Sequence, residues 1–94
     1  MQVNVEFSGV SRVLTRTPKI SLNLESVATF QDILRLLGER HPELLGEVID
    51  PTDYTLEGAN MLNLNGQRMV QPDQMRTSPS DGDRIILMSI LAGG

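Results

Sequence analysis

The residues with the clearest chemical potential are the last two, Gly93 and Gly94. Because glycine has no Cβ, two terminal glycines can enter a narrow slot in another protein and bring an α-carboxylate close to its backbone. A carboxylate resists nucleophiles until it is activated, and reaction with ATP would turn it into an acyl-adenylate that a thiolate or an amine can attack. We therefore expect the carboxylate of Gly94 to be the reactive group. The alternative is an ordinary frayed end, which glycine tolerates well.

The segment before the glycines has the reach that such a role needs. At ~3.3–3.6 Å per extended residue, Ser89 to Gly94 spans about 20 Å, enough to enter a partner's active site. No other residues of the chain are predicted to perform the activation. We therefore expect a carrier and substrate rather than an enzyme, with no bound cofactor, and with ATP used by the partner enzyme.

Composition limits the remaining possibilities. Ninety-four residues predict one domain, 1–94, with 90–94 as a flexible reactive tail. The chain has no cysteine and a formal charge of −4, with no basic cluster, which argues against disulfides, thiolate metal sites and nucleic acid as a direct partner. No apolar run approaches the ~20 residues of a membrane span, and no basic amino-terminal region precedes an apolar segment as in a signal peptide. We therefore predict a cytoplasmic protein without a membrane association.

The elements that position this end begin with two strands. Val3, Val5 and Phe7 alternate with polar residues, the period of a strand with one buried face, and the same pattern recurs from Ile20 to Leu24. The residues between them, Ser8 to Pro18, contain glycine, proline and polar side chains. They predict a long loop joining an antiparallel pair.

One helix is predicted next. Thr29 is a suitable N-cap, and Asp32 places negative charge in the first turn. The helix begins at Phe30, carries an apolar stripe with the spacing i, i+3, i+4, i+7, and ends between Gly38 and His41, before a proline. His41 is the only histidine, and its position near the helix end favours a structural role over a catalytic one.

Residues 43–60 have no clear period. Leu44, Leu45, Val48 and Ile49 could form a helical turn on the core. Asp50, Asp53 and Glu57 are conceivable cation ligands, but their spacing lacks the glycine and glutamate pattern of a calcium loop, so a solvated acidic loop is preferred.

The remaining sequence predicts a hairpin and a last strand. Asn65 and Gly66 suit a two-residue turn with positive φ angles, and Gly82 within Pro79–Asp83 suits a second turn leading to the apolar run after Arg84. The first and last strands are expected to lie parallel in the sheet centre. Ile86 or Met88 would then form an apolar patch on the face opposite the helix, either for a partner or beneath a loop.

The order of these motifs resembles the MoaD/ThiS-like β-grasp sulfur-carrier family. The resemblance rests on the first strand, the helix capped by Thr29, the Asn65–Gly66 hairpin, the Asp81–Asp83 turn and the terminal Gly93–Gly94. It implies an α+β fold of the ubiquitin-like β-grasp type, with a mixed sheet of four to five strands and one main helix packed on one face.

The same resemblance implies roles for individual residues. Gly94 would be adenylated by a ubiquitin-activating-type enzyme and converted to a thiocarboxylate that donates sulfur in molybdopterin- or thiamine-type cofactor biosynthesis or in tRNA thiolation. A synthase large subunit or a thiazole synthase would be a further partner. Two sets of residues would contact partners: Leu91, Ala92 and Gly93 thread the active site, and Phe7, Ile86 and Met88 form the docking face.

Three hypotheses remain open at this point. The first is the sulfur carrier, and the second is a ubiquitin-like modifier joined through Gly94 to lysines of other proteins. The third is a non-reactive interaction module with the same fold, because a fold does not by itself determine function.

Overall fold

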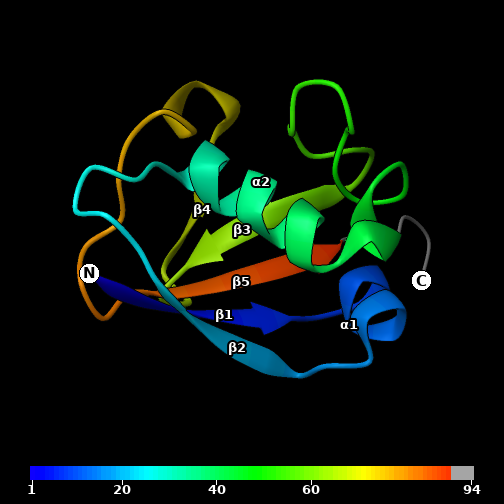
Figure 1. Ribbon diagram of the computed structural model, residues 1–94, viewed down its shortest axis with the longest axis horizontal. Coiled ribbons are helices and arrows are strands. Elements are labelled where there is room, and N and C mark those ends of the chain that lie inside the picture. Colours follow the sequence, from blue (N-terminus) through cyan, green and yellow to red (C-terminus); the bar gives the residue numbers. More distant parts are fainter. Residues whose placement is uncertain (90–94) are drawn as a thin grey trace.

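The computed structural model describes residues 1–89, whose strands form a single five-stranded sheet (Figure 1). The strands are β1 (Gln2–Phe7), β2 (Lys19–Asn23), β3 (Asn60–Leu64), β4 (Arg68–Val70) and β5 (Arg84–Ser89). The helices are α1 (Val10–Thr15) and α2 (Phe30–Arg40), with two short 3₁₀ helices at Pro42–Leu44 and Pro72–Gln74. No helix within residues 1–89 is both long enough and apolar enough to cross a membrane.

The five strands are arranged in the order β2-β1-β5-β3-β4. β1 and β5 pair in parallel, with Val5 opposite Ile85, and every other neighbouring pair is antiparallel. The predicted α+β fold, with its parallel central pair, its mixed sheet and one main helix on one face, is confirmed. β5 is thus held by a strand on each side.

Helix α2 forms where the sequence predicts it. The Thr29 hydroxyl accepts a hydrogen bond from the Asp32 N–H at 3.1 Å, and the Asp32 carboxylate accepts one from the Thr29 N–H at 2.9 Å. This reciprocal capping box satisfies two N–H groups that the first helical turn leaves unpaired. It also lowers the pKa of the Asp32 carboxyl below its usual value, and the main cause is the hydrogen bond from the Thr29 backbone N–H. The apolar stripe of α2 then faces the sheet.

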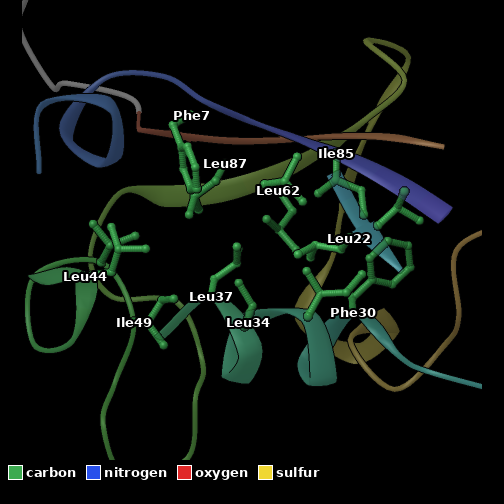
Figure 2. Close-up of a cluster of buried hydrophobic side chains, with 14 of the residues drawn as sticks. Phe7, Leu22, Phe30, Leu34, Leu37, Leu44, Ile49, Leu62, Ile85 and Leu87 are labelled. Carbon is green, nitrogen blue, oxygen red and sulfur yellow. The ribbon is translucent and has the colours of Figure 1, made fainter. Parts of the chain in front are cut away.

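The core lies between α2 and the inner face of the sheet (Figure 2). Each strand contributes alternate residues, because neighbouring side chains of a strand point to opposite faces. Fully buried members include Val3, Val5, Leu22, Ile33, Leu34, Leu37, Leu62, Ile85 and Leu87.

The segment before β2 differs from the prediction. Residues 8–18 were expected to be a loop, yet they contain α1. Six residues carry too little periodicity to announce a helix, and the stabilising contact is distant in sequence. The Ser11 hydroxyl, 1% exposed as a residue, donates to the carbonyl of Leu87 at 2.9 Å.

The predicted turns are present, with one difference. Asn65 and Gly66 have φ angles of 59° and 72°, and Gly82 has a φ of 86°, as expected for left-handed turn residues. Leu64 pairs with Arg68, so the hairpin connection comprises residues 65–67 rather than the predicted two.

Segment 43–60 packs mainly through three buried side chains, those of Leu44, Val48 and Ile49. Ile49 forms isolated bridges to Leu45 and Leu56, so most of the expected helical turn is instead irregular backbone folded on itself.

Candidate functional site

The strand that leads to the predicted reactive group is β5, the central strand of the sheet. It is described as far as Ser89. Gly94, and the predicted threading residues Leu91, Ala92 and Gly93, lie outside the described residues, so their roles stay predictions. The structure does describe the carboxyl end of β5, from which these residues continue.

The carboxyl end of β5 is held by the residues around the start of α1 (Figure 1). The Ser89 hydroxyl accepts a hydrogen bond from the Val10 N–H at 3.2 Å. The Ser8 N–H and the Ser11 hydroxyl both donate to the carbonyl of Leu87, at 3.0 and 2.9 Å. The carboxyl end of β5 is therefore hydrogen-bonded to residues 8–11, near the other end of the chain.

Gly9 allows this close approach. Its φ of 71° and ψ of −132° lie in a region that side chains rarely adopt, and a Cβ there would lie 2.3 Å from the Ser89 hydroxyl oxygen. Any other residue at position 9 would therefore displace the side chain of Ser89.

An apolar patch lies on the outer face of the sheet, the face opposite α2. Ile86 and Met88 point to this face because Ile85 and Leu87, which alternate with them, are fully buried on the inner side. Strand pairing places Met61 opposite Met88 and Asn63 between Ile86 and Met69. We call the half-buried apolar side chains Met61, Met69, Ile86 and Met88 the outer patch.

The sequence predicts Ile86 and Met88 for this face, whereas Met61 and Met69 join them through the strand pairing that the structure shows. A signal for them was present: Met61 alternates with Leu62, and the Asn65–Gly66 turn fixes which residues of the hairpin share a face. The pattern was not extended across the hairpin.

Phe7 is a correction to the predicted docking face. Its side chain points to the helix side of the sheet, as Figure 2 shows, and the residue is only 4% exposed. The edge of its ring packs against His41, with centroids 5.5 Å apart. Phe7 shares the buried period of Val3 and Val5, so it cannot lie on the same face as Ile86.

Polar groups border the outer patch. The Arg84 guanidinium pairs with the Glu6 carboxylate, and this hydrogen bond lowers the pKa of Glu6. Glu6 lies beside Ile86 in the parallel ladder, so the charge bordering the patch on this side is neutralised by an ion pair. The Asn63 side-chain oxygen is buried without a hydrogen-bond partner in the described structure.

The remaining candidates have structural positions. Within residues 1–89, no group of three or more His, Asp or Glu side chains has the arrangement of a metal site. Asp50 accepts hydrogen bonds from the N–H of Thr52 at 2.7 Å and of Asp53 at 3.3 Å, an arrangement that closes a turn. His41 Nδ1 lies 3.2 Å from the Glu43 carboxylate.

Comparisons with known proteins agree with the fold and identify a family. The sequence profile of the ThiS family matches residues 5–94. Small archaeal modifier protein 3 of Haloferax volcanii is 29% identical over 94 residues, which is 100% of each chain.

Two solved structures show the same fold. The crystal structure of SAMP1 from Haloferax volcanii superposes with a TM-score of 0.82 at 19% identity, covering 100% of both chains. A complex of subunits 1 and 2 of the molybdopterin-converting factor from Helicobacter pylori contains a chain with a TM-score of 0.61 at 20% identity, again covering 100% of both chains. Because the family profile matches nearly the whole sequence, this chain belongs to the ThiS family of ubiquitin-like β-grasp sulfur carriers and modifiers.

Proposed function

We propose that this protein is a sulfur carrier whose Gly94 carboxylate is adenylated and then converted to a thiocarboxylate. The observation that carries the proposal is the ThiS-family match, which runs from residue 5 through the terminal Gly93–Gly94. The anchored β5 supports it, because a strand fixed in the sheet centre gives the segment beyond Ser89 a defined starting point. The proposed setting is the cytoplasm.

The chemistry is divided between this chain and its partner. The Gly94 carboxylate attacks the α-phosphate of ATP bound by a ubiquitin-activating-type enzyme, and pyrophosphate leaves. Hydrosulfide supplied by the partner then attacks the acyl carbon, AMP leaves with the bonding electron pair, and loss of the sulfur-bound proton gives the thiocarboxylate. This chain supplies the carboxylate and the docking surface, whereas the enzyme supplies the nucleotide site and the sulfur.

Docking on the globular body is required by the energetics of the tail. Ordering five residues costs about 5–10 kcal/mol in backbone entropy, which contacts of Leu91, Ala92 and Gly93 in a channel would have to offset. We assign the additional binding energy to the outer patch, centred on Ile86 and Met88. Its apolar side chains are half-buried in the free protein and would lose their remaining contact with water on docking.

A second partner would accept the sulfur. The Helicobacter pylori complex joins a chain of this fold to the second subunit of a molybdopterin-converting factor. This supports a synthase large subunit as the acceptor for the present chain, with a thiazole synthase as the other candidate. Both would lead to cofactor biosynthesis, and tRNA thiolation is the third possible destination.

A specific observation favours one alternative, the protein modifier. The relative from Haloferax volcanii is called a modifier protein, and it matches the present chain over its full length. In that case the same adenylate would be attacked by a lysine amine, giving an isopeptide bond at Gly94.

Mass spectrometry of the protein isolated from its own cells distinguishes these functions. Replacement of one carboxylate oxygen by sulfur raises the intact mass by about 16 Da. Lysines of other proteins that carry residues 85–94, the remnant that trypsin leaves after cleavage at Arg84, would overturn the carrier in favour of the modifier if the sulfur form is absent. Deletion of Gly93 and Gly94 should abolish either activity. If the shortened protein keeps its cellular activity, both reactive functions are excluded and the non-reactive interaction module is the answer.

A further inference from the structure

Within residues 1–89, the sheet has one long edge without a neighbouring strand, that of β2. In the strand order β2-β1-β5-β3-β4, only β2 and β4 are edge strands. β4 has three residues and is followed by the 3₁₀ helix that begins at Pro72, two features that make an edge a poor template for another strand. β2 has five residues and contains no proline. Figure 1 shows it at the margin of the sheet, beyond β1.

The register shows which backbone groups of β2 point outward. Met1 and Leu24 exchange hydrogen bonds, each N–H lying 2.7 Å from the other's carbonyl. Such pairs alternate along an antiparallel ladder with pairs whose peptide groups point away from each other. The N–H and C=O groups of Lys19, Ser21 and Asn23 therefore face away from β1, along the free edge.

A groove runs beside this edge. It has a volume of about 680 Å³ and lies between α2 and the loop that follows β2, and it reaches β2 at the last residue of that strand, Asn23. Leu24 and Leu36 line it together with Val27, whose side chain is 78% exposed. A strand added outside β2 would lie about 4.8 Å away and would direct every second side chain to the helix side of the sheet, where this groove is.

The groove is acidic. Glu25, Asp32 and Glu39 line it, against the single guanidinium of Arg35, which donates to Asp32 at 3.2 Å. These four groups leave a formal charge of −2. A basic segment would complement this charge. A second copy of the chain, with a formal charge of −4, would instead bring the same carboxylates together if two β2 edges paired.

We propose that β2 and its groove bind an extended, lysine- or arginine-bearing segment of a partner protein as an additional strand. Backbone hydrogen bonds to Lys19, Ser21 and Asn23 would hold the segment, and its alternate side chains would meet Leu24, Val27 and Leu36. The surface is independent of the proposed sulfur chemistry. β1 separates β2 from β5, so the outer patch stays accessible while the edge is occupied.

The probe is a synthetic nine-residue peptide of alternating valine and lysine, added to the ¹⁵N-labelled full-length protein. Amide hydrogen exchange is followed by NMR. We expect slower exchange of the Ser21 and Asn23 amides on peptide addition and shifted signals for Val27 and Leu36. A valine–glutamate peptide of equal length should produce neither effect. Unchanged exchange at both amides with saturating basic peptide overturns the proposal.

Matched variants separate the backbone group from the side chain. Ser21→Pro removes one outward N–H and should weaken peptide binding about two- to twelvefold, corresponding to the loss of a backbone hydrogen bond. Ser21→Ala removes only the hydroxyl, which donates to the Asn4 side chain at 2.9 Å, and should bind like the unaltered protein. Equal affinity for the proline variant, folded by circular dichroism, refutes strand addition.

A charge-reversed variant keeps the proposal testable if the proline variant fails to fold. Glu25→Lys combined with Glu39→Lys should weaken the valine–lysine peptide and strengthen the valine–glutamate one. If the variant keeps the same preference between the two peptides, the proposal that the groove carboxylates select a basic segment is refuted. Analytical ultracentrifugation tests whether a second copy of the chain occupies the edge instead. If the free protein forms a dimer that Ser21→Pro dissociates and charge reversal leaves intact, the edge belongs to a second copy. That result would overturn the proposed partner.

Discussion

Gly9→Ala tests whether the carboxyl end of β5 is held by close contact between Gly9 and Ser89, as the structure indicates. The new methyl group would lie 2.3 Å from the Ser89 hydroxyl oxygen, far inside van der Waals contact. The oxygen can escape by rotation of the serine side chain, because the Ser89 Cβ itself would be 3.5 Å away. That rotation breaks the 3.2 Å hydrogen bond from the Val10 N–H.

Two effects contribute to the expected loss of stability. A non-glycine residue at a φ of 71° and a ψ of −132° is strained by about 1–3 kcal/mol. Loss of the hydrogen bond adds about 0.5–1.5 kcal/mol. We expect Gly9→Ala to lower the free energy of unfolding by about 1.5–4.5 kcal/mol, the sum of these two effects, measured from urea midpoints at an unchanged slope.

A double-mutant cycle isolates the contact. Ser89→Ala removes the hydroxyl, so Gly9→Ala introduced into that variant should cost only the backbone strain, and the two changes should couple by about 0.5–1.5 kcal/mol. Gly58→Ala is the matched control, since its φ is 60° but no atom lies within 4 Å of the new Cβ. Gly58→Ala should not couple to Ser89→Ala. Additivity of the Gly9 and Ser89 changes would refute the proposed contact.

Two further predictions concern docking and helix capping. Met88→Asp should lower kcat/KM for adenylation at least about tenfold, because it places a charge in an apolar interface, while the free energy of unfolding changes by about 1 kcal/mol or less; unchanged turnover would remove Met88 from the interface. Asp32→Asn should lower stability at pH 7 by about 0.3–1 kcal/mol. Since the pKa of Asp32 is lowered in the folded protein, this difference should shrink as the pH falls below about 3.9 and through the lower folded value; a difference independent of pH between 7 and 2 would contradict the ionic contribution to the cap.

Local sequence patterns predict those elements of the fold that depend on residues close together in the sequence. The capping residues Thr29 and Asp32 predict the start of α2, and Asn65 and Gly66 predict the hairpin, because each depends on neighbours within a few residues. Helix α1 could not be predicted in this way. Its Ser11 hydroxyl bonds to Leu87, 76 residues later, and Gly9 meets Ser89 only after the sheet has formed.

The docking face shows a different kind of error. The alternation of Val3, Val5 and Phe7 already indicates that Phe7 shares the buried face, yet Phe7 was grouped with Ile86 and Met88 through family resemblance. Period-two alternation alone would have separated them. Applied to β3, the same rule would have added Met61 to the outer patch.

The alternation along β5 also separates stability from docking. Ile85 and Leu87 are fully buried, so large-to-small changes there would cost folding energy in proportion to the apolar volume removed. Ile86 and Met88 point away from the core, so their replacement should affect docking more than folding. The proposed carrier function would benefit from this arrangement, because contacts with a partner can be weak without weakening the strand that leads to the proposed reactive group.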